Sequence, residues 1–557
     1  MDETCSVIPG DRPFGNRSGT RSVSLARRGM IATSQPLASS AGLDALRRGG
    51  NAVDAAVTAA AVLAVIEPTM TGIGGDLFAI VCEPGGRLHG LNASGPTGRT
   101  ASCEALGRAG HARIPSRGAL SVTVPGAVDG WSELLARHGT ITLAEALGPA
   151  IGYARDGFPV CEIVAGQWRE VEPALAANGA AADVFLPGGR APRAGEVFRN
   201  PWLARSLEEV AAGGRDAFYR GSIARAICAE LGSRGGLLDL EDFAAYAARW
   251  VEPLRATFRG CEVCELPPNT QGFVVLEMLN LLEGYDLGAM GHNTAPCLHA
   301  IVEAKRLAFA DRNAYLADPD CVDPAALTAL VSKDYASERR RSIDPERAAG
   351  VVGSGRLPSV SARLHGVADA APPSGAGDTV CLSVVDGRGM AVSLIQSLFE
   401  SFGSAVVAPE TGIVLQNRGS LFVLDPQHPN RLGPGKRPLH TLIPAMVLRD
   451  GRPLLSFGVM GGDLQPQGHV QVLINMLEFG MTVQEAAEAA RIRHSPDGVA
   501  VESGIGQAAR EGLTARGHRV FESRGVFGGF QGVQIDRASG VLMGGSDPRK
   551  DGLAIGF

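Results

Sequence analysis

Helices and strands are interspersed along the whole 557-residue chain, which predicts a mixed α/β or α+β fold rather than a helical bundle or a β-sandwich. An Ala-rich segment at 53–66 is apolar nearly all round, as expected for a buried helix. Two strand-like segments, 379–386 and 390–397, flank a GRG turn and predict a hairpin. With 45% hydrophobic and 20% charged residues, the chain has enough apolar mass for a large core.

The N-terminal half is predicted to consist of helices and one early hairpin. Ser39 and Ser40 can cap a short helix that stops at Gly49, and Asn51 can cap the Ala-rich helix, which stops before Pro68. The hairpin is predicted from LFAIV followed by the turn EPGGR. Further helices are predicted at 125–138, at 143–157 behind a Thr142–Glu145 capping box, and at 242–250 behind Asp239 and Asp242.

The second half continues this alternation of helices and strands. The predicted elements are a strand at 261–266, helices at 273–284 and 299–318, a strand at 454–460, a helix after Pro466, and a helix at 483–493 behind a Thr482–Glu485 capping box. No internal repeat is evident in the sequence.

Charge and hydropathy argue against two classes of partner. The net charge of −6 and the pI of about 6.0 argue against a nucleic-acid binder that works through bulk positive charge. The longest apolar run, 55–66, is too short to span a bilayer, so no membrane partner is expected. The N-terminus is polar and lacks the apolar core of a signal peptide. We therefore expect a cytoplasmic protein, with a periplasmic location left open.

The cysteines and histidines do not form a recognisable metal motif. Ten cysteines are scattered over the chain, so no disulfide framework is expected. The one CxxC pair, Cys261 and Cys264, lies in a predicted strand whose alternation places the two thiols on opposite faces. His299 and Glu303 are four positions apart on a predicted helix, but two ligands alone do not make a metal site. We therefore expect no metal.

Residues 350–378 differ in composition from the rest of the chain. They are rich in Gly, Pro, Ser and Ala and show no apolar period, which predicts a flexible linker that runs directly into the strand starting at Thr379. A threonine hydroxyl becomes an effective nucleophile when its own α-amine, with a pKa of about 7.7–8.0, serves as the base. That chemistry needs a cut between Asp378 and Thr379. From the residues alone, a threonine chosen for its β-propensity remains the more common explanation.

Acyl transfer also needs hydrogen-bond donors for an oxyanion. Gly461 and Gly462 lie between a predicted strand and a predicted helix, where successive N–H groups can converge on an anion, although a plain tight turn is the alternative. The sequence has no GxSxG, HExxH, P-loop or GxGxxG motif. A Ser-His-Asp triad is not excluded, because triads assemble in space rather than in sequence.

Four stretches of the sequence carry a family resemblance: MIATSQPLASSAGLDALRRGGNAVDAAVTAAAVLAVIEPTMTGIGGD, GDTVCLSVVDGRGMAVS, LGPGKRPLHTLIPAMVL and GVMGGDLQPQG. Together they resemble the γ-glutamyltranspeptidase family of N-terminal-nucleophile hydrolases, from Met30 to about Ser495. The resemblance implies a four-layer αββα sandwich, made as an inactive precursor and forming one intertwined unit. It also implies that no metal or organic cofactor takes part.

The resemblance further implies self-cleavage between Asp378 and Thr379. The products would be a large subunit, 1–378, which includes the linker 350–378, and a small subunit, 379–557, and the two would stay packed together. Thr379 would then attack a small-molecule amide, Gly461 and Gly462 would hold the oxyanion, and Ser397 would support the nucleophile. The acyl group would pass to water or to an amine acceptor.

Several positions depart from the γ-glutamyl pattern of that family. Asn92 stands where the family has an arginine for the donor's α-carboxylate, and Leu421 where it has an acidic residue for the α-ammonium. Phe399 replaces a polar amide, and His440-Thr441 replaces a serine pair. Because an unpaired buried ammonium costs several kcal/mol, a glutaryl donor, which lacks that amine, is expected to be favoured.

The donor's carboxylate still needs a cation. We expect Arg418 to bind it with His440 nearby, and we count Thr441 and Asn92 among the substrate-binding residues; a solvated loop charge is the alternative for Arg418. This pattern is most similar to the glutaryl-7-aminocephalosporanic acid acylases of the cephalosporin acylase I type, which retain some γ-glutamyl transfer. An oxamate-type hydrolase of small amides with the same fold and a non-catalytic binding protein are the alternatives.

Overall fold

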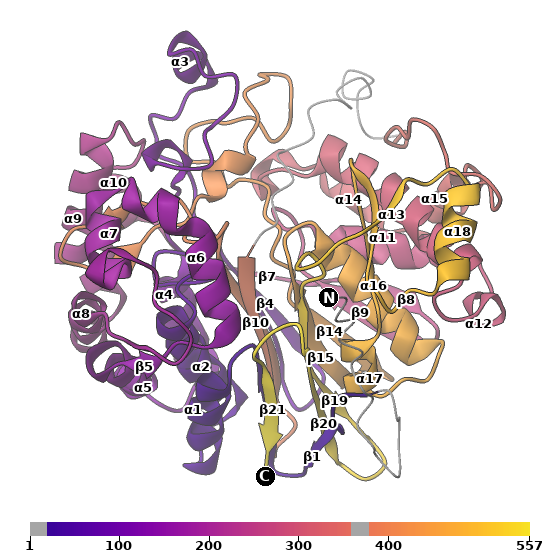
Figure 1. Cartoon of the computed structure of the whole chain (residues 1–557), viewed down its shortest axis with the longest axis horizontal. Helices are drawn as coiled ribbons and strands as arrows, with labels where there is room; N and C mark the ends of the chain where they lie inside the picture. The colour runs from indigo at the N-terminus through magenta and orange to yellow at the C-terminus, as the bar shows by residue number, and fades with distance from the viewer. Residues whose placement is uncertain (1–18, 358–377) are drawn as a thin grey trace, which may run out of the picture.

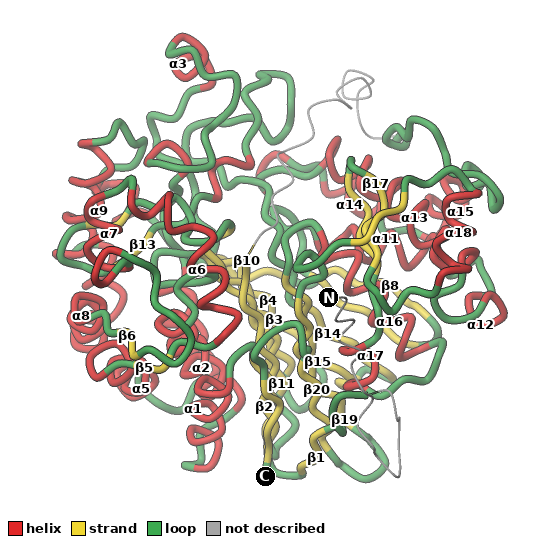
Figure 2. Tube along the Cα trace, viewed as in Figure 1, coloured by secondary structure: helices red, strands yellow, loops and turns green. Residues whose placement is uncertain are grey.

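Two stacked β-sheets between two layers of helices make up the protein (Figures 1 and 2). The computed structural model describes residues 19–357 and 378–557. This four-layer αββα arrangement confirms the fold that the resemblance implied. Most of the predicted linker, 358–377, lies outside the described residues. None of the described helices combines the length and the apolarity that a bilayer span requires.

The first sheet has seven strands, and each neighbouring pair is antiparallel. In spatial order the strands are β21 (Leu553–Gly556), β2 (Gly29–Thr33), β10 (Asp378–Asp386), β11 (Ala391–Phe399), β3 (Asp76–Cys82), β4 (Leu88–Ala93) and β7 (Arg249–Val251). The hairpin predicted around the GRG turn therefore forms the centre of this sheet, between strands that come from the N-terminal part of the chain.

The second sheet also has seven strands in antiparallel pairs. In spatial order they are β1 (Ser24–Ala26), β20 (Leu542–Ser546), β19 (Gly529–Ile535), β15 (Arg452–Met460), β14 (Ala445–Arg449), β9 (Cys261–Glu265) and β8 (Leu254–Phe258). Strands from before and after residue 378 are neighbours in this sheet too, at the β14–β9 pair. Neither sheet is complete without both parts of the chain.

Strand β10 contributes to two cores at once. Val380, Leu382 and Val384 face the helices outside the first sheet, whereas Cys381 and Val385 face the second sheet. The same alternation separates Cys261 from Cys264 in β9, which lie in different cores, as predicted. A strand that is buried on both faces needs apolar residues at successive positions, which explains the composition of this hairpin.

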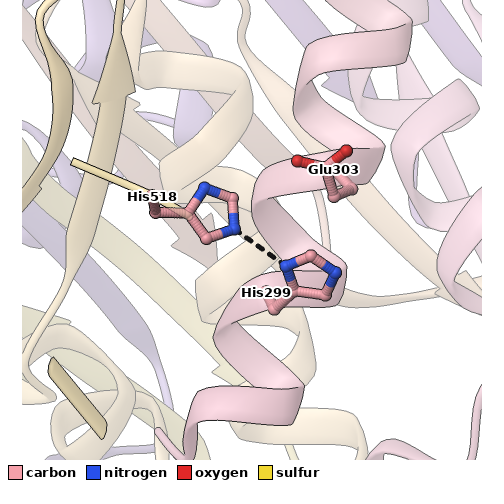
Figure 3. A group of neighbouring side chains, drawn as sticks. All are labelled: His299, Glu303 and His518. Carbon is pink, nitrogen blue, oxygen red and sulfur yellow. Dashed lines mark hydrogen bonds between the residues drawn. The ribbon is translucent and has the colours of Figure 1, made fainter. Parts of the chain in front are cut away.

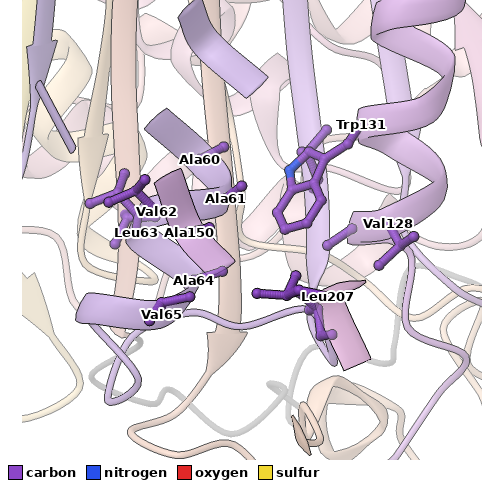
Figure 4. Close-up of a cluster of buried hydrophobic side chains, with 14 of the residues drawn as sticks. Ala60, Ala61, Val62, Leu63, Ala64, Val65, Val128, Trp131, Ala150 and Leu207 are labelled. Atoms are coloured by element: carbon purple, nitrogen blue, oxygen red, sulfur yellow. The ribbon is translucent and has the colours of Figure 1, made fainter. Parts of the chain in front are cut away.

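The core outside the first sheet is built around helix α2 (Ala52–Ile66), in which every side chain is buried. Its alanines allow α1 (Pro36–Arg47) and α5 (Leu143–Asp156) to pack closely against it. Figure 4 shows Ala60, Ala61 and Ala64 of this helix near the indole of Trp131. Trp131 Nε1 donates a hydrogen bond to Gln396 Oε1 at 3.2 Å, which joins the helical layer to β11.

Further helices cover both outer faces. Beside the first sheet lie α4 (Ala127–His138), α6 (Glu162–Ala176), α7 (Gly179–Phe185), α8 (Pro201–Tyr219), α9 (Ser222–Ser233) and α10 (Leu240–Ala245). Beside the second lie α11 (Gly272–Leu282), α12 (Leu287–Met290), α13 (Ala295–Tyr315), α14 (Pro324–Leu330), α15 (Lys333–Arg340), α16 (Leu464–Leu477), α17 (Val483–Glu488) and α18 (Gln507–Ala515). The remaining elements are α3 (Cys103–Arg108) and the small sheets β5 (Phe158–Pro159) with β6 (Val197–Phe198), β12 (Val407–Ala408) with β13 (Ile413–Val414), and β16 (Ile492–Ser495) with β17 (Gly498–Val501) and β18 (Val520–Glu522).

Helix starts follow the predicted capping residues in four cases. Asn51, Thr142, Asp239 and Thr482 each begin a helix with a reciprocal capping box. Each box satisfies two backbone donors that the first helical turn leaves without partners. These local hydrogen bonds explain why the four starts are predictable from sequence.

Some predicted boundaries are wrong. Helix α1 begins at Pro36, and Ser39 and Ser40 lie inside it rather than at its cap. The reason is that Pro36 suits the first helical position and Gln35 Oε1 accepts the Leu37 N–H at 2.6 Å. Helix α16 begins at Leu464, before Pro466, and α13 begins at Ala295 rather than at residue 299. Helix α10 ends at Ala245 rather than at residue 250, because the chain at 249–251 joins the first sheet.

Asp54 is expected to contribute strongly to stability. Its carboxylate accepts the N–H groups of Asn51 at 2.7 Å, Thr140 at 2.8 Å and Ile141 at 3.2 Å, and its side chain is buried. Asp54→Ala leaves these donors without that partner, so we expect the unfolding free energy to fall by about 3 kcal/mol in urea denaturation. Glu145→Ala, at the same capping-box position on an exposed helix start, is the control and should cost clearly less. Equal losses for the two variants would contradict this account.

Candidate active site

Thr379 lies at the beginning of β10 with its side chain buried. Its Oγ1 donates a hydrogen bond to Ser397 Oγ on the neighbouring strand β11 at 3.3 Å. The pairing of β10 with β11 is irregular between Asp378 and Val380, and such bulges re-aim side chains near functional sites. The predicted nucleophile and its predicted supporting hydroxyl are therefore in contact.

Arg418 reaches the same hydroxyl from a buried 3₁₀ turn, Arg418–Leu421. Its Nη2 donates to Ser397 Oγ at 3.3 Å and its Nη1 to Thr441 Oγ1 at 2.9 Å, while the guanidinium lies 4.4 Å from the centre of the Phe399 ring. Its Nε is buried and has no hydrogen-bond partner among the described residues. Full burial rules out the solvated loop charge that was the alternative for Arg418.

Two ionisable side chains share the surroundings of Arg418. Burial lowers the pKa of Arg418 to about 9, although Asp76 and Glu400 act in the opposite direction. Burial raises the pKa of Asp76 to about 7 against the attraction of Arg418. Burial and the charge of Arg418 hold the pKa of His440 well below its usual range. Neutral His440 donates its Nε2–H to Asp76 Oδ2 at 3.1 Å, and its Nδ1 accepts the Leu442 N–H at 3.3 Å.

Asn92 is connected to this group through Asn269 and Ser94. Its Nδ2 donates to Asn269 Oδ1 at 2.8 Å, and its Oδ1 accepts the Ser94 hydroxyl at 2.7 Å. The carbonyl of Asn269 in turn accepts the backbone N–H of His440 at 2.8 Å. Asn92 thus helps to position the segment that carries His440 and Thr441.

The two predicted oxyanion glycines form a turn directly after β15, which we call the Gly-Gly turn (Gly461–Gly462). Both have positive φ angles, 120° and 59°, a conformation that favours glycine. The Nε2 of Gln271 donates to the carbonyls of Thr441 at 3.0 Å and of Gly462 at 3.2 Å. One amide therefore links the Gly-Gly turn to the residue that also binds Arg418.

The Gly-Gly turn and Thr379 lie at the same end of the sandwich. Cys381 Sγ lies 3.4 Å from the carbonyl of Gly458, and the Ser383 hydroxyl lies 3.2 Å from the carbonyl of Gln531, which pairs with Gly458. Cys381 also contacts the carbonyl of Gly529, the partner of Met460. The start of β10, at Thr379, therefore lies on the side of the sandwich where the opposing strand β15 ends in the Gly-Gly turn.

Several residues of this site were not predicted from the sequence. Gln271 is held by Arg312, whose Nη1 donates to Gln271 Oε1 at 2.9 Å and to Asp463 Oδ1 at 2.6 Å. Asp76 and Asn269 are the other two. Gln271, Asn269 and Asp76 lie in loops or at element ends next to glycines or prolines (GIGGD, PPNTQG), and that position was the only signal available in the sequence.

A cavity of about 1280 Å³ lies beside this group of residues. Its lining includes Glu400, which directly follows Phe399. It also includes Gly528, whose Cα lies 3.2 Å from where a Cβ on Gly461 would stand. Thr379, Ser397 and Arg418 do not line the cavity themselves, so it reaches the site only through these neighbouring residues. Its wall carries charges of both signs and can admit a polar small molecule.

A threonine at the start of a central strand, a second hydroxyl beside it and a Gly-Gly turn at the same end of an αββα sandwich define the class of N-terminal-nucleophile hydrolases. Comparison with known proteins specifies the family. The family model described as gamma-glutamyltranspeptidase matches residues 38–557, and the chain belongs to this family of enzymes.

Three relatives illustrate the range of the family. The crystal structure of a cephalosporin acylase from Bacillus halodurans is 40% identical, with a TM-score of 0.90 and 99% of each chain covered. The glutathione hydrolase-like YwrD proenzyme of Bacillus subtilis is 39% identical over 95% of this chain and 98% of its own. The oxamate amidohydrolase proenzyme of Klebsiella pneumoniae is 37% identical over 96% and 100%.

Gln271→Glu is expected to lower kcat about ten-fold or more, because a carboxylate cannot donate to the carbonyls of Thr441 and Gly462 and repels them. The measurement is steady-state hydrolysis of a chromogenic glutaryl anilide, the donor type expected from the sequence. Asn280→Asp is the control. This buried amide lies in α11, the helix that Gln271 caps, and donates to the carbonyl of Val331, which is not one of the site residues named above. A similar loss of kcat in both variants would show a general effect of burying a carboxylate.

Proposed function

We propose that this enzyme is a self-processing N-terminal-threonine acylase. It transfers a glutaryl or γ-glutamyl group from an amide to water or to an amine acceptor through an acyl-Thr379 intermediate. The observation that carries this proposal is the buried series of contacts from Thr379 through Ser397 to Arg418, at the same end of the sandwich as the Gly-Gly turn. These contacts support Thr379 as the nucleophile and Arg418 as the acid-binding cation, with the Gly-Gly turn as the proposed oxyanion site.

The first reaction is cleavage of the chain before Thr379. Thr379 Oγ1 attacks the carbonyl carbon of Asp378, the peptide C–N bond breaks, and the nitrogen takes a proton to become a free amine. Water then hydrolyses the resulting ester, which leaves a carboxylate on Asp378 and restores the hydroxyl. The hydrogen bond to Ser397 orients Oγ1 for this attack. The products, 1–378 and 379–557, stay together because both sheets contain strands from each.

In turnover, the new α-amine of Thr379 takes the proton of Oγ1, and Oγ1 attacks the amide carbonyl of the donor. The N–H groups of Gly461 and Gly462 stabilise the negative oxygen that develops. The ammonium then gives its proton to the leaving amine, and an acyl ester remains on Thr379. Water or an amine acceptor attacks this ester and releases the product.

Donor choice follows from Arg418. Its unpaired Nε–H and its fully buried charge are compensated when a carboxylate binds, because charge-assisted hydrogen bonds are strong in a low-dielectric site. Leu421 and Phe399 are apolar and buried where an ammonium partner would be needed. These features support a glutaryl donor over a γ-glutamyl donor.

A small-amide hydrolase of the oxamate type is the second candidate, and the Klebsiella relative supports it. Oxamate also carries a carboxylate that Arg418 can bind. The two candidates differ in acyl length: turnover of five-carbon glutaryl amides supports the acylase, and turnover of oxamate alone supports the alternative. The relatives carry enzyme names, so a non-catalytic binding protein is no longer favoured.

Purified protein is expected to contain two chains, the smaller beginning TVCLSVVD, by intact mass and N-terminal sequencing. Thr379→Ala should remain a single chain, because it has no hydroxyl to attack Asp378. Thr379→Ser keeps a hydroxyl and should still be cut, and Ser397→Ala should be cut more slowly. Cleavage at the same bond in Thr379→Ala would assign the cut to another agent.

Arg418→Met is expected to lower kcat/KM for a glutaryl amide about ten- to hundred-fold, mainly through KM, since one charge-assisted interaction is lost. A neutral acyl amide of equal length should change by less than about three-fold. Arg524→Met, which removes a cation from the wall of the neighbouring cavity, is the control. Equal effects of Arg418→Met on both donors would refute the role of Arg418 in binding the acid.

A further inference from the structure

Three potential metal ligands meet on the outer side of the second helical layer, away from the site described above. His299 and Glu303 lie one turn apart on α13, and His518 follows α18 (Figure 3). One nitrogen or oxygen of each side chain lies within 4.8 Å of the others, and all three residues are buried. The sequence pattern had offered only the two ligands of α13, and the fold adds the third.

The two histidine rings are arranged for donation to a metal. His299 Nε2 lies 2.8 Å from the carbonyl of Asp344, which can only accept, so this nitrogen carries the proton and the lone pair of the neutral ring is on Nδ1. That Nδ1 lies 2.8 Å from His518 Nε2. In this pair His518 Nε2 is the donor, because His299 Nδ1 carries the lone pair.

Glu303 is also held in place by other groups. Its Oε1 accepts a hydrogen bond from Arg306 Nη1 at 2.8 Å, and its Oε2 accepts the N–H of Ala349 at 3.1 Å. Outer hydrogen bonds of this kind, a histidine N–H on a carbonyl and a carboxylate bound by donors, typically orient metal ligands. Each carboxylate oxygen keeps a lone pair that these bonds do not use.

We propose that His299, Glu303 and His518 bind one divalent transition metal of the zinc type, with water in the fourth position. Two imidazoles and a carboxylate suit Zn²⁺, and such ligand atoms lie about 3.4 Å apart around it. The two ring nitrogens, now 2.8 Å apart, therefore need to separate by about 0.6 Å, and Glu303 needs to come within that distance of about 3.4 Å of both. The metal replaces the hydrogen bond between the rings. The proton on His518 Nε2 moves to Nδ1 through solvent, so both rings bind in their neutral form.

The site joins two parts of the chain that lie on opposite sides of residue 378. Helix α13 precedes that residue and His518 follows it. If the chain is cut as proposed above, the metal ties the large subunit to the small one. The metal site itself does not depend on that cleavage, so the two proposals fail independently.

The test uses the full chain, freed of metal by a chelator, and titrates it with Zn²⁺ alone. Equilibrium dialysis with metal analysis should give one equivalent per chain. His518→Ala and Glu303→Gln should bind at least about ten-fold more weakly, whereas His138→Ala, a half-buried histidine on α4, should bind as the wild type does. Thermal unfolding without metal shows whether each variant is folded.

Co²⁺ provides a second readout that needs no variant. Intense visible absorption with one equivalent of Co²⁺ would support a low-coordinate site with histidine ligands. Absence of saturable Zn²⁺ binding, or full binding retained by folded His518→Ala, would overturn the proposal and leave a hydrogen-bonded histidine pair beside Glu303. A cobalt spectrum typical of six-coordinate aqueous ion would overturn it in the same way.

Discussion

The positive charge of Arg418, buried at one end of the stacked sheets, constrains the rest of the site. A guanidinium removed from water costs several kcal/mol unless hydrogen bonds and nearby negative charge replace its hydration. The hydroxyls of Ser397 and Thr441 accept from it, the ring of Phe399 lies against its face, and Asp76 lies near enough to attract it. These partners come from β11, from β3 and from the segment before β14, so groups from three segments surround one buried charge.

Burial shifts the pKa of Asp76 and the pKa of Arg418 in opposite directions. The pKa of Asp76 rises to about 7 and that of Arg418 falls to about 9, because low-dielectric surroundings disfavour both charged forms. One guanidinium N–H of Arg418 also has no acceptor among the described residues, so this donor is available to a carboxylate. In such low-dielectric surroundings the attraction between a bound carboxylate and the cation is stronger than it is in water.

Features that depend on sequence neighbours could be predicted, and features that depend on distant partners could not. The capping box at Asn51 and the hairpin that begins at Thr379 need only nearby residues. The first helix start was misplaced because Gln35, a less usual cap, accepts the bond that a serine was expected to accept. Asp76 and His440 are 364 positions apart, and no local pattern pairs them. The role of Thr379 came from family resemblance, because its residue type alone favoured an ordinary strand.

The interleaving of strands in both sheets has a consequence for quality control in the cell. The β10–β11 hairpin places Ser397 beside Thr379, but its surroundings, strands β2 and β3, are complete only when chain segments hundreds of residues apart have found their places. Contacts of such long range form late and slowly in folding. Under the proposed self-cleavage, a chain with an incomplete sheet cannot cut itself and stays inactive. Cleavage then distinguishes, by a permanent covalent change, the chains that have folded completely from those that have not.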